Sequence, residues 1–374
     1  MSSPVPYLDF QQFKIEELIK KYDFFSTNKL FAEVYKVQQK ENGHFYIANV
    51  SRPEDKDDDE QSPMRMTKII YNIDYPSVLE IIGYSKAKFE NELRTVVITE
   101  YYPNGNLSDM INSEKSGNPF PGWNMTKKLI SIYGIASGIL YMHMRNYIHR
   151  DLKPSKIVMD ESLFPKIRGF NVLISCDDEA MEKHFKGTPE YMAPEILRRE
   201  QSTKAMDVYS FAMIVYELIT LKKPFEDIHN TNIIKILQRV QQGNMPEIDD
   251  SVPESFKKLI QQCWAQEPDE RPTFNQIVHS LRTDPGFIID GVNKDEYLDY
   301  IKYLDHYSII KAKRRSSLSV STEEEVQQLR DQLASKTDEN NQLREEIEKL
   351  KRSLLEEKEK YNDAMQQLEN LQKQ

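Results

Sequence analysis

Cysteine, tryptophan and long apolar runs are all scarce in this chain. Its 374 residues include two cysteines and two tryptophans. Cys176 and Cys263 stand far apart without metal-ligand spacing, which argues against a disulfide framework or a zinc site and favours a reducing compartment. No apolar run approaches the ~20 residues that span a bilayer, and the opening MSSPVPYLDF has no basic-then-apolar signal pattern. These absences predict an intracellular protein with no membrane partner, and the cytoplasm is the default location.

Positive charge is also in deficit. The 50 lysines and arginines are outnumbered by 60 aspartates and glutamates, which gives a formal net charge of −10. Nucleic acid is therefore disfavoured as a partner, because phosphate binding requires a concentrated basic surface. Hydrophobic residues make up 39% of the chain and aromatic residues 10%, which is enough for a buried core and argues against wholesale disorder.

The composition divides the chain into zones. Residues up to about 102 are rich in β-type segments, such as FAEVYKVQQKENGHFYIANV, which predicts two strands joined by a turn at Asn42-Gly43. From 103 to about 285, long apolar segments without proline predict buried helices, among them KKLISIYGIASGILYMHMRN and DVYSFAMIVYELITL. A β-rich small lobe followed by a helical large lobe is an α+β fold.

The carboxyl-terminal zone has a different period. From Val326 onward apolar residues recur at alternating spacings of three and four, with no proline or glycine, which predicts a coiled coil over residues 323–374. Asn340 falls on the seam, where a buried asparagine favours a parallel dimer in register. A solvated single helix, or a helix packed on the main domain, is the alternative. Residues 286–322 are expected to form a tail and a serine-rich linker.

Ordered motifs in the first two zones carry a family resemblance. In chain order they are AEVYK, TEYYPNGNLSDMI, GILYMH, IHRDLKPS, KGTPEYMAPEIL, DVYSFAMIVYELI and CWAQEPDERPTF. This set resembles the protein kinase superfamily, and most closely its tyrosine-kinase-like group. The resemblance implies a bilobal kinase-like domain over residues 22–285, with a small lobe over 22–102, a large lobe over 103–285 and an amino-terminal extension over 1–21.

The phosphate-binding parts of that family pattern are altered. The three glycine positions of the glycine-rich loop fall on Thr27, Lys29 and Ala32, so no glycine lets the backbone approach the phosphates. The strand-three lysine position falls on Asn49. Its glutamate partner aligns, less securely, with Met66.

Neither magnesium ligand of the family is present. The catalytic-loop asparagine position holds Lys156, and the metal-binding aspartate position holds Gly169 in Gly169-Phe170-Asn171. Magnesium requires oxygen ligands, usually carboxylates together with phosphate and water. No metal ligand is therefore predicted.

Other family positions are retained. Asp151 matches the catalytic base, and Lys153 matches a residue used near the phosphate acceptor together with Thr188. Asp207 matches an aspartate that braces the catalytic loop. A structural ion pair of the large lobe is matched by Glu195 and Arg271. These roles can survive the loss of catalysis, so Asp151 is interpreted first as retained architecture.

An adenine-shaped slot is also implied by the resemblance. Its positions are Val34, Ala48, Glu100, Tyr102 and Val158. ATP can therefore be a ligand without a recognisable magnesium site, although the apolar members can instead fill the slot as core.

The predicted function is a catalytically impaired kinase-like signalling protein, a pseudokinase scaffold or allosteric partner on a coiled-coil oligomer, which requires no cofactor. Its partners would be a second copy of the chain and other kinases or signalling proteins. The alternative is an active or weakly active ATP-dependent serine/threonine kinase. A third hypothesis is a switch that binds nucleotide without metal and without turnover.

Overall fold

The protein is described by a computed structural model. It describes residues 4–21, 31–52, 63–170, 173–176, 187–228 and 232–317, with side chains up to residue 307. The chain divides into two compact units, Met1–Tyr307 and Ser308–Gln374. The predicted glycine-loop positions Thr27 and Lys29, together with Asn171 and the predicted coiled coil, lie outside the described residues.

A five-stranded antiparallel sheet forms the small lobe. In spatial order its strands are β1 (Phe13–Lys21), β2 (Phe31–Gln39), β3 (Phe45–Ser51), β5 (Glu92–Glu100) and β4 (Ile81–Phe89). The predicted turn joins β2 to β3, where Gly43 has a φ of +73° and His44 N donates to Asn42 Oδ1 over 2.9 Å. Alternating apolar residues supply the strands with one buried face, and Val37, Ala48 and Ile98 are completely buried.

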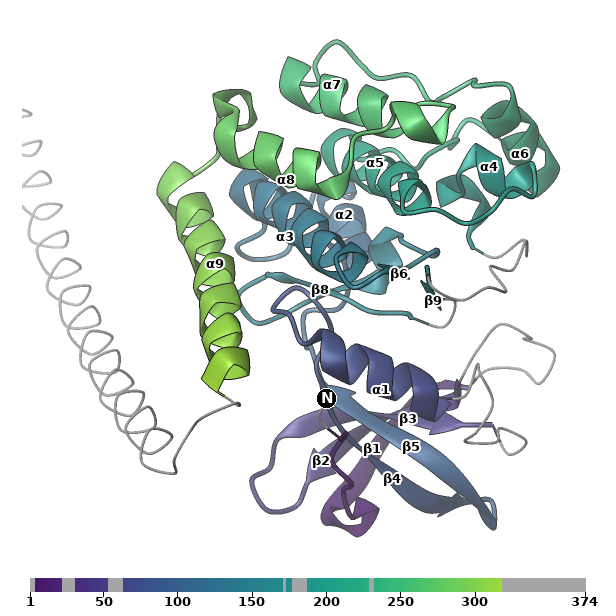
Figure 1. Cartoon of the computed structure of the whole chain (residues 1–374), viewed down its shortest axis with the longest axis vertical. Helices are drawn as coiled ribbons and strands as arrows, with labels where there is room; N and C mark the ends of the chain where they lie inside the picture. Colours follow the sequence, from purple (N-terminus) through teal and green to yellow (C-terminus); the bar gives the residue numbers. More distant parts are fainter. Residues whose placement is uncertain are drawn as a thin grey trace, which may run out of the picture. The chain divides into compact units, whose positions relative to one another are not determined.

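One amphipathic helix belongs to the small lobe. Helix α1 (Pro63–Ile73) lies against the sheet (Figure 1) and buries Met66, Ile70 and Ile73. These positions recur at spacings of four and three, which places them on one face of the helix.

The large lobe is built around two almost completely buried helices, α3 (Met125–His143) and α5 (Ala205–Thr220). Both helices carry apolar residues on all of their faces, as expected for helices in the centre of a lobe. The other helices of this lobe are α2 (Leu107–Lys115), α4 (Pro194–Leu197), α6 (Ile233–Gln241), α7 (Glu254–Cys263) and α8 (Phe274–Thr283). Four short strands carry the catalytic region: β6 (Tyr147–Ile148) pairs with β9 (Ile174–Ser175), and β7 (Ile157–Met159) pairs with β8 (Pro165–Ile167).

A further helix occupies part of the expected tail and linker. Helix α9 (Lys294–Ser317) buries Tyr297, Tyr300, Ile301 and Leu304. Tyr297 Oη donates to the Leu281 carbonyl oxygen at the end of α8 over 2.9 Å, and Tyr300 Oη lies 3.2 Å from Ser77 Oγ in the α1–β4 connection. Residues 294–307 are therefore integral to the kinase-like unit, and α9 runs from α8 towards the small lobe (Figure 1).

Within the described part of the chain, no helix is both long enough and apolar enough to cross a bilayer.

Candidate functional site

One buried carboxylate, that of Asp207, anchors the loop between β6 and β7. Asp207, in the first turn of α5, accepts hydrogen bonds from the backbone amides of His149 and Arg150, each over 2.9 Å. His143 Nε2 lies 2.8 Å from the same carboxylate. Burial alone would raise the pKa of Asp207, but the hydrogen bonds with His143 and with the His149 amide lower it overall. The loop is therefore fixed to the centre of the large lobe by an ionised group.

The His149 imidazole lies inside the loop, and its contacts are those of a neutral ring. Its Nε2 is 3.1 Å from the Arg168 carbonyl oxygen, and its Nδ1 accepts from the Asp151 amide over 3.3 Å. Burial lowers the pKa of His149, against the opposing effect of Asp207 and Asp151. One donor and one acceptor is the hydrogen-bonding pattern of neutral imidazole. The ring also contacts Phe170, with the two centroids 5.4 Å apart.

Three retained family positions meet at the acceptor side of the site. Thr188 Oγ1 donates to Asp151 Oδ1 over 2.9 Å, and Lys153 Nζ donates to Thr188 Oγ1 over 2.5 Å. Lys153 Nζ lies 3.7 Å from the Asp151 carboxylate. The structure thus brings together the predicted base and its two predicted neighbours.

The opposite side of Asp151 is occupied by Lys156. Its ammonium lies 3.5 Å from Asp151 Oδ2, and its side chain is 21% exposed. The lysine also lies across the α-carbon of Gly169, whose φ is +91°, so that a Cβ built on this glycine would come within 2.7 Å of Nζ and 2.8 Å of Cε. Burial lowers the pKa of Lys156, while Asp151 opposes that shift. The ammonium therefore occupies the space that a residue-169 side chain would enter.

These residues do not fit a magnesium ion. Asp151 is the carboxylate of the cluster, and the groups at the two metal-ligand positions are an ammonium and a hydrogen atom. Among the described residues, no three His, Cys, Asp or Glu side chains come together as a metal site. An ammonium repels a divalent cation and offers it no lone pair.

The two family positions that hold an ion pair in the small lobe are occupied here by the uncharged residues Asn49 and Met66. Asn49 on β3 uses its side-chain amide to donate to the Val97 carbonyl oxygen over 3.3 Å. Met66 on α1 is 6% exposed and belongs to the apolar core. Ala32 lies on β2, near the point where the described residues resume. Met66 therefore fills a position in the core without leaving an unpaired buried charge.

Four of the five predicted slot positions lie on strands, and Tyr102 follows the end of β5. Ala48 on β3 is fully buried and Val158 on β7 is 7% exposed, while Val34 on β2 is half-buried. Glu100, at the end of β5, and Tyr102 are half-buried as well. Burial raises the pKa of Glu100, and Glu80 adds to the effect.

The predicted ion pair of the large lobe is formed. Arg271 Nη1 and Nη2 donate to the two carboxylate oxygens of Glu195 over 2.7 and 2.8 Å, and both side chains are buried. Arg271 also donates to three backbone carbonyls, so its guanidinium is satisfied in the interior.

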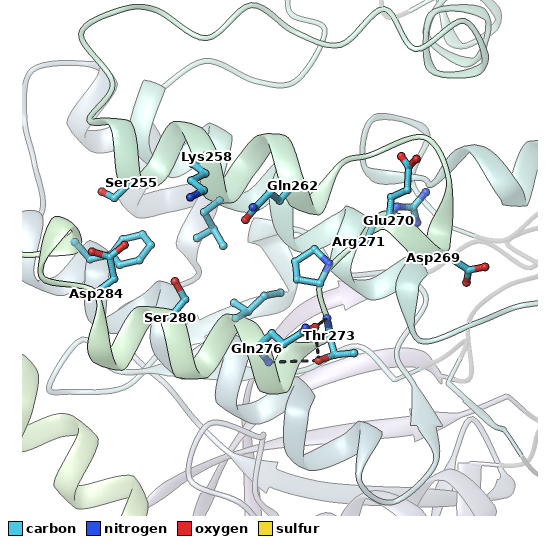
Figure 2. A pocket seen from close by; sticks show the side chains of 14 residues that line it. Ser255, Lys258, Gln262, Asp269, Glu270, Arg271, Thr273, Gln276, Ser280 and Asp284 are labelled. Atoms are coloured by element: carbon cyan, nitrogen blue, oxygen red, sulfur yellow. Dashed lines mark hydrogen bonds between the residues drawn. The ribbon is translucent and has the colours of Figure 1, made fainter.

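Sequence reasoning missed two features. His143, the side-chain partner of Asp207, stands in the GILYMH motif without a predicted role. A cavity of about 610 Å³ between α7 and α8 was not anticipated either (Figure 2), and it shares no residue with the catalytic loop. One visible signal near it was T-x-x-Q, because Thr273 and Gln276 form a capping box at the start of α8.

Comparison with known proteins agrees with this geometry. The family model described as "Protein kinase domain" matches residues 30–281. Similar proteins include the dual specificity protein kinase shkC of Dictyostelium discoideum (32% identical over 194 residues, 50% of this chain and 37% of the relative). They also include the RGS domain-containing serine/threonine-protein kinase A of the same organism (34% over 186 residues, 50% and 16%). A third is the MAP3K epsilon protein kinase 1 of Arabidopsis thaliana (29% over 246 residues, 65% and 17%).

The aligned regions thus span 16% to 37% of the length of these three relatives. The family model, in contrast, matches more than half of this chain and ends close to the last residue of α8. The bilobal architecture, the anchored catalytic loop and the family match lead to one assignment. The chain belongs to the protein kinase domain family.

Proposed function

We propose that this chain is a catalytically impaired member of the kinase family, of the tyrosine-kinase-like group, which acts by binding other signalling proteins. One observation carries the proposal: the Lys156 ammonium lies against Asp151 and over Gly169, where the family holds its metal ligands. Removing a single preorganised electrostatic group commonly reduces a rate by about 10²–10³. Such losses are not additive, but all the replacements at this site act in the same direction.

The mechanism of such a protein is recognition. A kinase-shaped surface contacts an active kinase or a substrate, and a coiled coil over residues 323–374 raises the local concentration of the partners. Both the self-association and the identity of the partners are proposals from the sequence. The cytoplasm is the location that we propose, with no cofactor required.

An active serine/threonine kinase is the second candidate. The observation that favours it is the ordered contact of Asp151, Thr188 and Lys153 on a loop anchored by Asp207. Two of the similar proteins carry serine/threonine or dual-specificity kinase names. This candidate requires a metal arrangement that does not use positions 156 and 169, or transfer without metal.

Phosphate transfer distinguishes the two candidates. The full chain should be incubated with γ-labelled ATP and Mg²⁺ or Mn²⁺, alone and with a general protein substrate. The proposal predicts that incorporation equals that of the Asp151→Asn variant, since a contaminating kinase would not respond to this change. Metal-dependent incorporation that Asp151→Asn abolishes would establish the active kinase instead.

A further inference from the structure

The contact between Lys156 and Gly169 links two replacements that stand apart in the sequence. Strands β7 and β8 pair antiparallel with Ile157 opposite Ile167, and the Arg168 amide donates to the Lys156 carbonyl oxygen over 2.8 Å. This register places the Lys156 side chain beside Gly169. A Cβ at position 169 would come within 2.7 Å of the lysine nitrogen, so a larger residue there would require the end of the Lys156 side chain to move aside. The φ of +91° at Gly169 by itself favours glycine. The two replacements therefore lie side by side in the fold.

The pair reverses the sign of the local charge. In the family pattern an aspartate at position 169 would add a second carboxylate beside Asp151, and a bound cation would compensate for both. Here the cluster of described residues has the Asp151 carboxylate facing the ammonium groups of Lys156 at 3.5 Å and Lys153 at 3.7 Å. Two positive charges against one negative charge leave an excess of one positive charge. The site repels a divalent cation and attracts an anion.

The Lys156 ammonium is also held in place. Its side chain is 21% exposed, Asp151 binds it on one side and Gly169 lies beneath it. A partly desolvated charge interacts more strongly with a ligand charge than a solvated one does. Holding the ammonium in advance also removes much of the side-chain entropy loss on binding.

We propose that Lys156 is a tethered replacement for the metal ion, so that the cleft binds the polyphosphate of an adenine nucleotide in the absence of a divalent cation. The nucleotide is favoured over a free or protein-bound phosphate because Val158, an expected slot residue that is 7% exposed, follows Lys156 by two residues on β7, and Ala48, a second expected slot residue, is buried on β3. The inference rests on the proposed function, since it assigns a ligand to a site that is proposed to have lost catalysis.

Nucleotide titration of the full chain tests the proposal. Isothermal titration calorimetry should be performed with ATP, with adenosine and with tripolyphosphate, each in excess EDTA and in excess Mg²⁺. The wild type is expected to bind ATP in EDTA at least as tightly as in Mg²⁺. Lys156→Met should weaken ATP binding in EDTA by ten-fold or more and leave adenosine binding unchanged, because adenosine has no phosphate for the ammonium to contact.

The matched control is Lys222→Met, which removes one lysine from the surface pair with Asp249 at the end of α5. Its ATP affinity should equal that of the wild type, and thermal unfolding should establish that both variants fold. ATP binding that requires Mg²⁺, an unchanged affinity in Lys156→Met, or no ATP binding at millimolar concentration would each overturn the inference. Tripolyphosphate binding as tight as that of ATP would overturn the nucleotide assignment. ATP binding that requires Mg²⁺ would also weaken the proposed loss of catalysis, which the phosphate-transfer assay tests separately; the other results leave that proposal standing.

Discussion

At the scale of single residues, the anchoring of the β6–β7 loop is separate from the residues at the two metal-ligand positions. Asp207 holds the loop through the amides of His149 and Arg150, so the backbone path does not depend on the metal positions. Lys156 and Gly169 lie on that path and take no part in its anchoring to Asp207. This separation explains how a kinase loop can remain folded after its metal ligands are lost, since each position makes its own local contacts.

The buried neutral His149 predicts a pH effect on stability. Burial lowers the pKa of His149 from its ordinary value of 6.5, so the unfolded chain takes up a proton first as the pH falls below that value. Protonation of Nδ1 would also remove the acceptor of the Asp151 amide. The free energy of unfolding should therefore decrease between pH 7 and pH 5.

Urea unfolding at several pH values measures this effect. A His149→Gln variant, which cannot titrate in that range, should show a shallower decrease than the wild type. A variant of the exposed His279, His279→Gln, should retain the wild-type slope. Equal slopes for wild type and His149→Gln would contradict the assignment of the effect to His149.

At the scale of elements, α9 is the part of the fold that the sequence did not predict. Its segment KDEYLDYIKYLDHY contains buried residues at helical spacing, namely Tyr297, Tyr300, Ile301 and Leu304. Tyrosines on a charged segment are easily interpreted as exposed. Their burial depends on partners far away in sequence, such as Ser77 and the Leu281 carbonyl, which no local pattern reveals.

Removal of one hydroxyl tests the docking of α9. Tyr300→Phe would leave the completely buried Ser77 hydroxyl without its partner, which should lower the free energy of unfolding by about 1–3 kcal/mol. Tyr303→Phe is the matched control, because this tyrosine on the same helix is 45% exposed. Chemical denaturation of both variants should show a shift of the midpoint in Tyr300→Phe alone; equal midpoints for the two variants would contradict this docking.

Other elements of the fold could be predicted because their sequence patterns are local. The β2–β3 hairpin has an Asn-Gly turn between alternating strands, and α3 and α5 are long apolar segments without proline. The motif residues Asp151, Thr188 and Asp207 have fixed roles in the resemblance, so the bracing of the loop by Asp207 and the closeness of Thr188 to Asp151 were anticipated. The contact of Lys156 with Gly169 was not, because it depends on the register of β7 and β8.

At the scale of the whole molecule, the two proposals divide the chain by task. The kinase-like unit, Met1–Tyr307, would supply the recognition surface and the nucleotide site. The predicted coil over 323–374 would join two copies of the chain, so that one assembly carries two binding surfaces. Binding of one partner to each kinase-like unit would then bring two partners together, which requires no chemistry from the site.

Self-association has a direct test in the full chain. Size-exclusion chromatography with light scattering should give twice the monomer mass for the wild type, since the seam spacing predicts a dimer. Leu343→Pro interrupts the seam helix and should give the monomer mass, because proline removes a helix hydrogen bond and clashes with the preceding turn. Gln342→Ala, adjacent to the seam, is the control and should remain dimeric. A monomeric wild type would contradict the predicted homodimer.

The central claim is that the phosphate end of this cleft excludes a divalent cation. Water-proton relaxation enhancement by Mn²⁺, measured with the full chain and a non-hydrolysable ATP analogue, tests it most directly. The wild type is predicted to give no enhancement above that of the Mn²⁺–nucleotide complex in buffer, since Lys156 and Gly169 provide no ligand. The double variant Lys156→Asn/Gly169→Asp, which restores both family ligands, is predicted to give a saturable enhancement. Saturable enhancement by the wild type, at one Mn²⁺ per chain, would contradict the account.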